Sequence, residues 1–415
     1  MKKNTRFYYL FPSLILFICS NSCAQQAKEN RDTKHTYFKS TYIDPILLPL
    51  QLNDSIIINS VFDTGAMPSI CIDSTFFKVH NIIRPDIKPI QVRPGGSAWS
   101  VSLIRSNVYT YTSTPTIQIK NTLLTYDQMR VYNQKIHYAG SEADCIFNIP
   151  ANDTTHIWEI NFQHNYIEIH TDSNFHMPSS CYILPIIKGT KANNPFNIKL
   201  PMRIKCPNGD TLTIERTFMI DTGMAWDIAL LHGAKELDFF NRQKDAIWTT
   251  YLWSYHRHYN VEATIFDNMK IDSLRIYTFD YPNQVNSNYL IGTNFLKRFN
   301  VFLDLKKQLI GLQPIRNFQR IVNPTARRYH IAFKPTPQKT LVIKDIADYE
   351  KNYFKKAGLQ KGDEIIAMNG KPYKNITPKE EDEMYMQEFI TFDILRKGKR
   401  LKIVMPIDHK EVQGD

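Results

Sequence analysis

The sequence predicts a mainly β protein made of two matched β units, followed by a smaller C-terminal domain. The 415-residue chain contains 22 Tyr and 24 Phe but only 15 Gly, and aromatic side chains favour strands. The tripeptide Asp-Thr-Gly occurs twice, each time at the end of an apolar, strand-like run. Beyond Pro314 the composition changes and a different series of strand-like runs begins. The length by itself favours two or three domains.

The composition is that of an ordinary globular protein. Hydrophobic residues make up 43% and charged residues 22% of the chain, which argues against a disordered protein. The formal net charge is +11, but Lys and Arg are scattered and form no basic stripe interleaved with aromatic residues. This pattern favours a solvated basic surface, so we expect no nucleic-acid partner.

Residues 1–23 have the pattern of an export signal. Basic residues open the chain, and the apolar run 7–19 that follows is short for a membrane span. Small and polar residues come next, as at a cleavage site. We therefore interpret residues 1–23 as a signal peptide and residues 24–40 as a tether.

Cys23 resembles the acceptor cysteine of bacterial lipoproteins. The departure is Ser20, which stands where that pattern usually has Leu, so ordinary cleavage after Ala24 is the alternative. In both cases we expect an exported protein of the cell envelope, in the periplasm or as an outer-membrane lipoprotein. Contact with the membrane would then be through a lipid anchor only.

The first β unit opens with a hairpin and ends at the first Asp-Thr-Gly. The run Ile46–Leu52 is followed by the polar turn 53–55 and by the run Ile56–Phe62, which leads to Asp63. The second unit repeats this with the runs 196–204 and 211–218, leading to Asp221. Alternation and turn residues predict a hairpin in each unit. The two aspartates lie 158 positions apart (221 − 63), about the length of one lobe.

Both units also close alike. In the second, the apolar run 289–292 is followed by a helix-like segment and by two runs, 301–305 and 308–312. In the first, residues 144–147 are followed by the runs 158–162 and 165–169. We interpret each close as a buried strand, a short helix and a β-hairpin. A duplicated unit of roughly 130 to 150 residues is the simplest explanation.

These motifs resemble those of aspartic proteases. Two apolar residues, Asp-Thr-Gly and a later apolar-apolar-Gly are typical of that class, and the unit ending Gly-x-x-Phe-Leu resembles the retropepsin-like aspartyl proteases of bacteria. The resemblance covers Tyr42–Pro314. Two such units in one chain imply a pepsin-like bilobal fold, with an N-terminal lobe at 41–170 and a C-terminal lobe at 171–315.

The resemblance implies an aspartic endopeptidase, a hydrolase of peptide or protein substrates. Asp63 and Asp221 would activate a shared water, which attacks the scissile carbonyl without a covalent intermediate. Thr64 and Thr222 would cross-link the two loops. Gly65 and Gly223 would permit the backbone conformation and let N–H groups approach the carboxylates. Two adjacent carboxyls cannot both ionise, so they would titrate as one unit.

Two departures from the family pattern support an alternative, a catalytically silent lipoprotein that binds peptides in the same cleft. Phe147 stands where the second unit has Gly292, and Met224 follows the second Gly, where the family usually has Ala, Ser or Thr. The family also has a mobile flap, and paired glycines permit such a turn. Gly95 and Gly96 are our candidates for its tip.

No metal or cofactor is expected. Cys71, Cys145, Cys181 and Cys206 could form disulfides in an exported protein, with three possible pairings, or could be small buried residues. The pair His256 and His258 has no evident third ligand nearby.

Residues 316–328 form a basic linker, and residues 329–408 resemble a PDZ domain. The resemblance lies in Tyr353–Lys371, with its Ala-Gly-Leu, Gly-Asp and Asn-Gly turns, and in the closing runs 389–396 and 401–405. A PDZ domain implies a C-terminal or internal peptide ligand, added as a strand at a sheet edge. The carboxylate-binding loop would be His330, Ile331, Ala332 and Phe333, although it lacks the glycines usual there. The domain could instead regulate the cleft or only pack against it.

Overall fold

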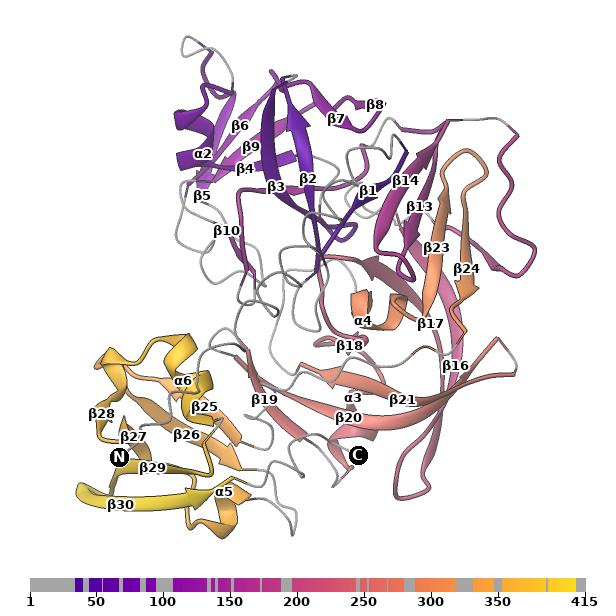
Figure 1. The fold of residues 1–415 in the computed structure, drawn as a ribbon. Helices are drawn as coiled ribbons and strands as arrows, with labels where there is room; N and C mark the ends of the chain where they lie inside the picture. Colours follow the sequence, from indigo (N-terminus) through magenta and orange to yellow (C-terminus); the bar gives the residue numbers. More distant parts are fainter. Residues whose placement is uncertain are drawn as a thin grey trace, which may run out of the picture.

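The computed structural model shows a mainly β protein of several sheets (Figure 1). It describes residues 34–39, 45–53, 55–66, 70–82, 87–94, 107–132, 136–138, 141–150, 153–171, 174–187, 196–243, 247–251, 254–266, 268–279, 288–316, 318, 331–346, 353–385 and 387–407. Within these ranges no helix combines the length and the apolar character needed to cross a membrane.

A nine-stranded sheet organises the N-terminal lobe, with the order β5-β6-β9-β4-β12-β3-β2-β7-β8. Its strands are β2 (Ile46–Leu52), β3 (Ile56–Phe62), β4 (Ile70–Asp73), β5 (Gln91–Pro94), β6 (Asn107–Tyr111), β7 (Ile117–Ile119), β8 (Thr122–Leu124), β9 (Met129–Tyr132) and β12 (Cys145–Phe147). A separate pair consists of β10 (Ile136–Tyr138) and β11 (Ser141–Ala143). Asp73 caps helix α2 (Ser74–Val79), because its carboxylate accepts the N–H groups of Thr75 and Phe76 at 2.8 and 3.0 Å.

A seven-stranded sheet organises the C-terminal lobe, with the order β16-β17-β22-β18-β21-β20-β19. Its strands are β16 (Asn197–Lys205), β17 (Thr211–Asp221), β18 (Ile228–Leu230), β19 (Ile247–Tyr251), β20 (Ser254–Ile265), β21 (Met269–Thr278) and β22 (Tyr289–Gly292), with helices α3 (Leu237–Asn241) and α4 (Thr293–Leu296). In β16, buried and exposed residues alternate over most of its length, so one face of the strand meets the core.

The two sheets have the same topology. Seven strands of the N-terminal lobe, β5-β6-β9-β4-β12-β3-β2, correspond in order and direction to β19-β20-β21-β18-β22-β17-β16. The parallel pairs also correspond: β12 with β3 matches β22 with β17, and β4 with β9 matches β18 with β21. The predicted duplication is therefore confirmed at the level of strand order. The hairpin β7–β8 fits the same plan, because it pairs with the end of β2 as the hairpin formed by the end of β20 and the start of β21 pairs with the end of β16.

A six-stranded sheet joins the lobes and takes strands from both (Figure 1). Its order is β1-β14-β13-β23-β24-β15, with β1 (Thr36–Tyr37), β13 (Ile157–Asn161), β14 (Tyr166–His170), β15 (Tyr182–Pro185), β23 (Phe299–Asp304) and β24 (Leu309–Pro314). The two predicted closing hairpins, β13–β14 and β23–β24, meet at its centre. One continuous buried core extends through this sheet and both lobes.

A third domain has its own sheet and core. Its elements are β25 (Ile331–Pro335), β26 (Leu341–Ile346), α5 (Tyr353–Lys356), β27 (Glu364–Met368), β28 (Lys371–Pro372), the 3₁₀ helix η2 (Tyr373–Asn375), α6 (Pro378–Tyr385), β29 (Phe389–Arg396) and β30 (Lys399–Pro406). The sheet order is β25-β26-β27-β29-β30. Buried Ile343, Phe354 and Phe392 belong to a hydrophobic cluster of this domain alone.

Two expectations need correction and one question is answered. The short helix predicted to close the first unit is wrong for the described residues 148–150 and 153–156, whereas its counterpart in the second unit is α4. The run 329–333 was expected to be strand-like, and its residues His330–Phe333 to form the carboxylate-binding loop; Ile331–Pro335 forms strand β25, so the strand is confirmed and the loop is wrong for Ile331–Phe333. Cys71, Cys145, Cys181 and Cys206 form no disulfide among the described residues.

Candidate functional site

Each Asp-Thr-Gly begins where a central strand ends, and the first forms a tight carboxylate-centred turn. Asp63 follows β3, and its N–H donates to the carbonyl of Phe147 at 2.9 Å. Its Oδ1 accepts the N–H groups of Gly65 and Ala66, both at 2.9 Å. Hydrogen bonds to a carboxylate favour its charged form, so this turn is built to hold an acid at a fixed position.

The two loops are tied together by a symmetric set of four hydrogen bonds through buried threonines. The N–H of Thr64 donates to Oγ1 of Thr222 at 3.0 Å, and the N–H of Thr222 donates to Oγ1 of Thr64 at 3.1 Å. The hydroxyls donate in turn to the carbonyls of Ile220 and Phe62, at 2.9 and 2.8 Å. Every polar atom named in this exchange has a partner, which makes the junction rigid.

Each aspartate lies against the glycine of the opposite loop. A Cβ built on Gly65 would lie 2.5 Å from Cγ of Asp221, and a Cβ on Gly223 would contact the carboxyl of Asp63 as closely. Neither glycine has a left-handed φ, so the expected conformational reason is wrong for these two positions. The reason is space: only glycine lets the two carboxyls converge on the junction.

This geometry predicts a large effect for Gly223→Ala and for Gly65→Ala. Because carbon atoms in contact are about 3.5–4.0 Å apart, the opposite carboxyl would have to move by about 1 Å, which lowers the rate of a catalysed reaction by roughly 10²-fold. Peptide cleavage by the folded variants measures this. The control is Gly209→Ala at the β16–β17 turn, where a Cβ meets nothing within 4 Å but φ is 91°. Gly209→Ala should lower the stability but keep the wild-type cleavage rate. Equal cleavage rates in all three variants would show that the space at Gly65 and Gly223 does not matter for catalysis.

The carboxyl of Asp221 is the group expected to retain a proton. Burial raises its pKa well above the ordinary value, and the nearby charge of Asp63 with a hydrogen bond to it raises it further. The N–H groups of Gly223 and Met224 oppose these effects only in part. A neutral carboxyl beside a charged one is the arrangement that general acid–base chemistry requires.

The raised pKa predicts how stability depends on pH. In the folded protein Asp221 holds its proton at pH values where the unfolded chain has released it, so its contribution is complete below pH 3.8 and is lost as pH rises through the folded pKa. Asp221→Asn removes this term. Relative to wild type, the variant should therefore gain up to about 1.4 kcal/mol per pH unit between pH 4 and the folded pKa. Thermal unfolding of both proteins from pH 4 to 7 measures the difference; a difference that stays constant would contradict it.

The counterpart of Gly292 is Asn148, and the sequence-based assignment to Phe147 is wrong. Strand pairing sets Gly292 opposite Asp221 but Phe147 opposite Phe62, so the next residue, Asn148, faces Asp63. Asn148 is fully buried, and no sequence signal had marked it as part of the site.

The remaining candidates lie away from the junction or outside the described residues. Gly95 and Gly96 follow β5 and lie outside the described residues, as do Cys23 and His330. Ile331 and Phe333 are buried in the core of the third domain, and Ala332 lies between them in β25.

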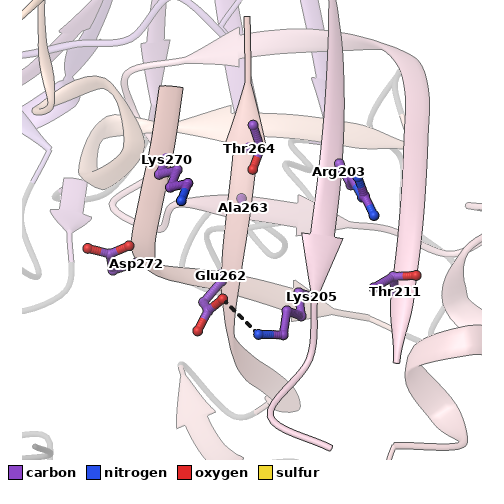
Figure 2. Close-up of a pocket in the computed structure, with 8 residues that line it drawn as sticks. All are labelled: Arg203, Lys205, Thr211, Glu262, Ala263, Thr264, Lys270 and Asp272. Carbon is purple, nitrogen blue, oxygen red and sulfur yellow. Dashed lines mark hydrogen bonds and ion pairs between the residues drawn. The ribbon is translucent and has the colours of Figure 1, made fainter. Parts of the chain in front are cut away.

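A hollow on the C-terminal lobe is unrelated to the aspartates. It is lined by residues of mixed charge on β16, β17, β20 and β21 (Figure 2). Thr211, in its lining, begins β17, and Asp221 ends it; ten residues of strand span roughly 33 Å. Lys205 and Glu262 form an exposed ion pair there at 3.4 Å.

A polar cluster on the joining sheet brings together three possible metal ligands, Glu159, Glu168 and His170, within the described residues. Glu159 accepts from Asn161 and Tyr166, both at 2.9 Å, and pairs with His170 at 2.9 Å. Burial raises the pKa of Glu159, but these hydrogen bonds outweigh it and lower the pKa overall. Since these side chains already satisfy one another, we interpret the cluster as a structural network.

No protein-family model matches the sequence, and no curated protein is significantly similar to it. Among solved structures, the chain is similar to the crystal structure of an aspartic proteinase from Irpex lacteus. The TM-score is 0.43 and the identity 11%, over 70% of this chain and 99% of that one. The geometry of the two Asp-Thr-Gly loops, and not this likeness, carries the functional conclusion.

Proposed function

We propose that the protein is an aspartic endopeptidase that hydrolyses peptide bonds with a water activated between Asp63 and Asp221. The observation that carries this is the reciprocal junction, in which Thr64 and Thr222 lock the loops and each carboxyl lies against the opposite glycine. An ordinary turn needs no reciprocal hydrogen bonds to a second loop. This junction brings the two carboxyls together, where burial and the charge of Asp63 raise the pKa of Asp221.

The chemistry follows from unequal protonation. The ionised carboxyl removes a proton from the water as the water oxygen attacks the carbonyl carbon. The neutral carboxyl, which we assign to Asp221 before reaction, donates to the carbonyl oxygen and so neutralises the charge of the tetrahedral intermediate. Collapse of that intermediate releases the amine after a proton returns to its nitrogen. The protein supplies two oriented carboxyls and needs no covalent intermediate.

A peptide library and a mimic of the tetrahedral intermediate test this proposal against the silent peptide-binding alternative. The protein, produced from Gln25 onward, is incubated with the peptide library from pH 3 to 8. The cleavage products of the library are identified by mass spectrometry. A peptide in which a hydroxyl-bearing tetrahedral carbon replaces the scissile amide should bind at least about 10²-fold more tightly than the uncleaved parent sequence. A folded protein that cleaves nothing and binds both equally would overturn the protease and favour the binding protein.

For the third domain we propose a PDZ-type role in peptide capture. Strand β25 lies at the edge of its sheet and pairs with β26 on one side. It also contacts β19 and β20, the hairpin that corresponds to β5–β6 of the N-terminal lobe (Figure 1). A peptide added at β25 would therefore lie beside a hairpin of the protease lobe. Titration of a library of free C-terminal peptides against amidated versions tests whether a terminal carboxylate is recognised.

We further propose export to the cell envelope, with residues 1–23 as the signal and Cys23 as the lipidated residue. The basic start, the apolar run and the small residues before Cys23 support this. Cys23→Ser should abolish incorporation of labelled palmitate if the anchor exists, whereas cleavage after Ala24 would leave both versions unlabelled.

A further inference from the structure

Different groups donate hydrogen bonds to the backbone carbonyls of the two Asp-Thr-Gly loops. In the C-terminal lobe the support is Gly292 and Thr293. A Cβ on Gly292 would collide with the carbonyls of Trp226 and Met224, so only glycine fits. The N–H of Thr293 donates to the carbonyl of Met224 at 2.7 Å, and its hydroxyl donates to that of Thr222 at 2.8 Å.

In the N-terminal lobe one side chain replaces both of these donors. The corresponding residues are Asn148 and Ile149, and Ile149 has no hydroxyl. Nδ2 of Asn148 donates to the carbonyl of Ala66 at 2.7 Å and to that of Thr64 at 3.3 Å. These acceptors are the counterparts of Met224 and Thr222.

The carboxamide of Asn148 is fully engaged. Its Oδ1 accepts the N–H of Ile149 at 2.7 Å, the group that in the other lobe would reach the loop directly. The carbonyl of Asn148 accepts the hydroxyl of Tyr126 at 2.6 Å, and Asn148 itself is fully buried. Because each of these atoms has a partner, the side chain is held in one orientation and acts as a relay into the loop.

The contact with Thr64 reaches the carboxylate through a single peptide unit. The carbonyl of Thr64 and the N–H of Gly65 belong to the same planar peptide group, with the two dipole ends pointing in opposite directions. Asn148 holds the carbonyl end, and the N–H end donates to Oδ1 of Asp63 at 2.9 Å. Fixing one end therefore orients and polarises the donor that stabilises the charged form of Asp63.

We propose that Asn148 is a positioning residue for Asp63, doing with a carboxamide what Gly292 and Thr293 do for Asp221. This inference rests on the proposed protease function. It implies that the asymmetry of the two carboxyls is built partly by their supports: one loop is held by a side chain and the other by backbone and a hydroxyl.

The test first removes the carboxamide of Asn148 and then introduces the Gly-Thr pair of the C-terminal lobe at positions 148 and 149. Asn148→Gly should lower kcat by roughly 10- to 10²-fold with little change in KM, because the carboxylate moves while the cleft keeps its lining. It should also shift the acidic limb of the kcat/KM profile to higher pH, because Asp63 loses an oriented donor. The double variant Asn148→Gly/Ile149→Thr, which recreates the Gly-Thr pair, should recover a large part of kcat and move the limb back.

The matched control is Asn161→Ala, a buried asparagine on the joining sheet that donates to Glu159 and Tyr166. It should lower the melting temperature and leave kcat and the pH profile unchanged. If Asn148→Gly does not fold, Asn148→Asp replaces it, since it keeps the shape but loses the amide donor. Unchanged kcat and pH profile in a folded Asn148 variant, or an equal loss of kcat in Asn161→Ala, would overturn the inference. An inactive wild-type protein would overturn the proposed function and this inference with it, so the two failures are distinguishable.

Discussion

Replacing either Asp63 or Asp221 with Asn is expected to lower peptide cleavage by at least roughly 10²- to 10⁴-fold, the usual range for loss of a positioned acid or base. The amide cannot exchange a proton with water or substrate at neutral or acidic pH. Its oxygen can still accept the N–H groups of Gly65 and Ala66, so the loop should keep its shape in Asp63→Asn. Cleavage rates of purified variants on a peptide found in the library measure the loss.

The double variant distinguishes a coupled pair from two independent contributions. If the two carboxyls act as one unit, Asp63→Asn/Asp221→Asn should be no slower than either single variant, because each single change already disables the pair. The control is Asp272→Asn in the exposed hollow of Figure 2, which should keep the wild-type rate. A single variant that retains wild-type cleavage would show that the carboxyls do not share the reaction.

The local parts of the fold could be predicted from the sequence because their signals are local. The hairpin β2–β3 has the bounds that alternation and the polar turn at 53–55 indicated, and the closing hairpins lie within a residue or two of their predicted ends. The duplication was visible because both copies keep the same apolar runs around Asp-Thr-Gly. Strand order then followed the repeat.

The parts that could not be predicted depend on pairing between distant residues. Whether Phe147 or Asn148 faces Asp63 is a matter of register, and a shift of one residue changes the side chain that supports the loop. The sequence also does not show why residue 65 must be glycine. The space beside Gly65 is taken by the carboxyl of Asp221, which lies 156 positions away (221 − 65). The joining sheet combines hairpins from both units, a contact that no single segment encodes. Helix α6 is short and rich in acidic residues, so it carries almost no apolar periodicity.

Arg298→Ala is expected to destabilise the C-terminal lobe by about 3–5 kcal/mol, because it removes a cation that is paired with the buried carboxylate of Asp227. The guanidinium of Arg298 donates to Oδ1 of Asp227 at 2.9 Å, and Asp227 is fully buried. It also donates to the carbonyls of Asn294 and Ser273, at 2.6 and 2.7 Å. The melting temperature should fall by at least roughly 6 °C, given about 2–4 °C per kcal/mol for a domain of this size.

The backbone of Asp227 links this ion pair to the strand end opposite Asp221. The carbonyl of Asp227 accepts the N–H of Gly292 at 2.8 Å, so a disturbed Asp227 also disturbs the strand end opposite Asp221. Arg298→Lys keeps the charge but not the planar guanidinium. It should lower the stability by an intermediate amount, because lysine cannot donate to all three acceptors with the same geometry. The exposed pair of Figure 2 is the control: Lys205→Ala should cost less than about 1 kcal/mol. Equal losses of stability for Arg298→Ala and Lys205→Ala would mean that burial does not set the strength of these ion pairs.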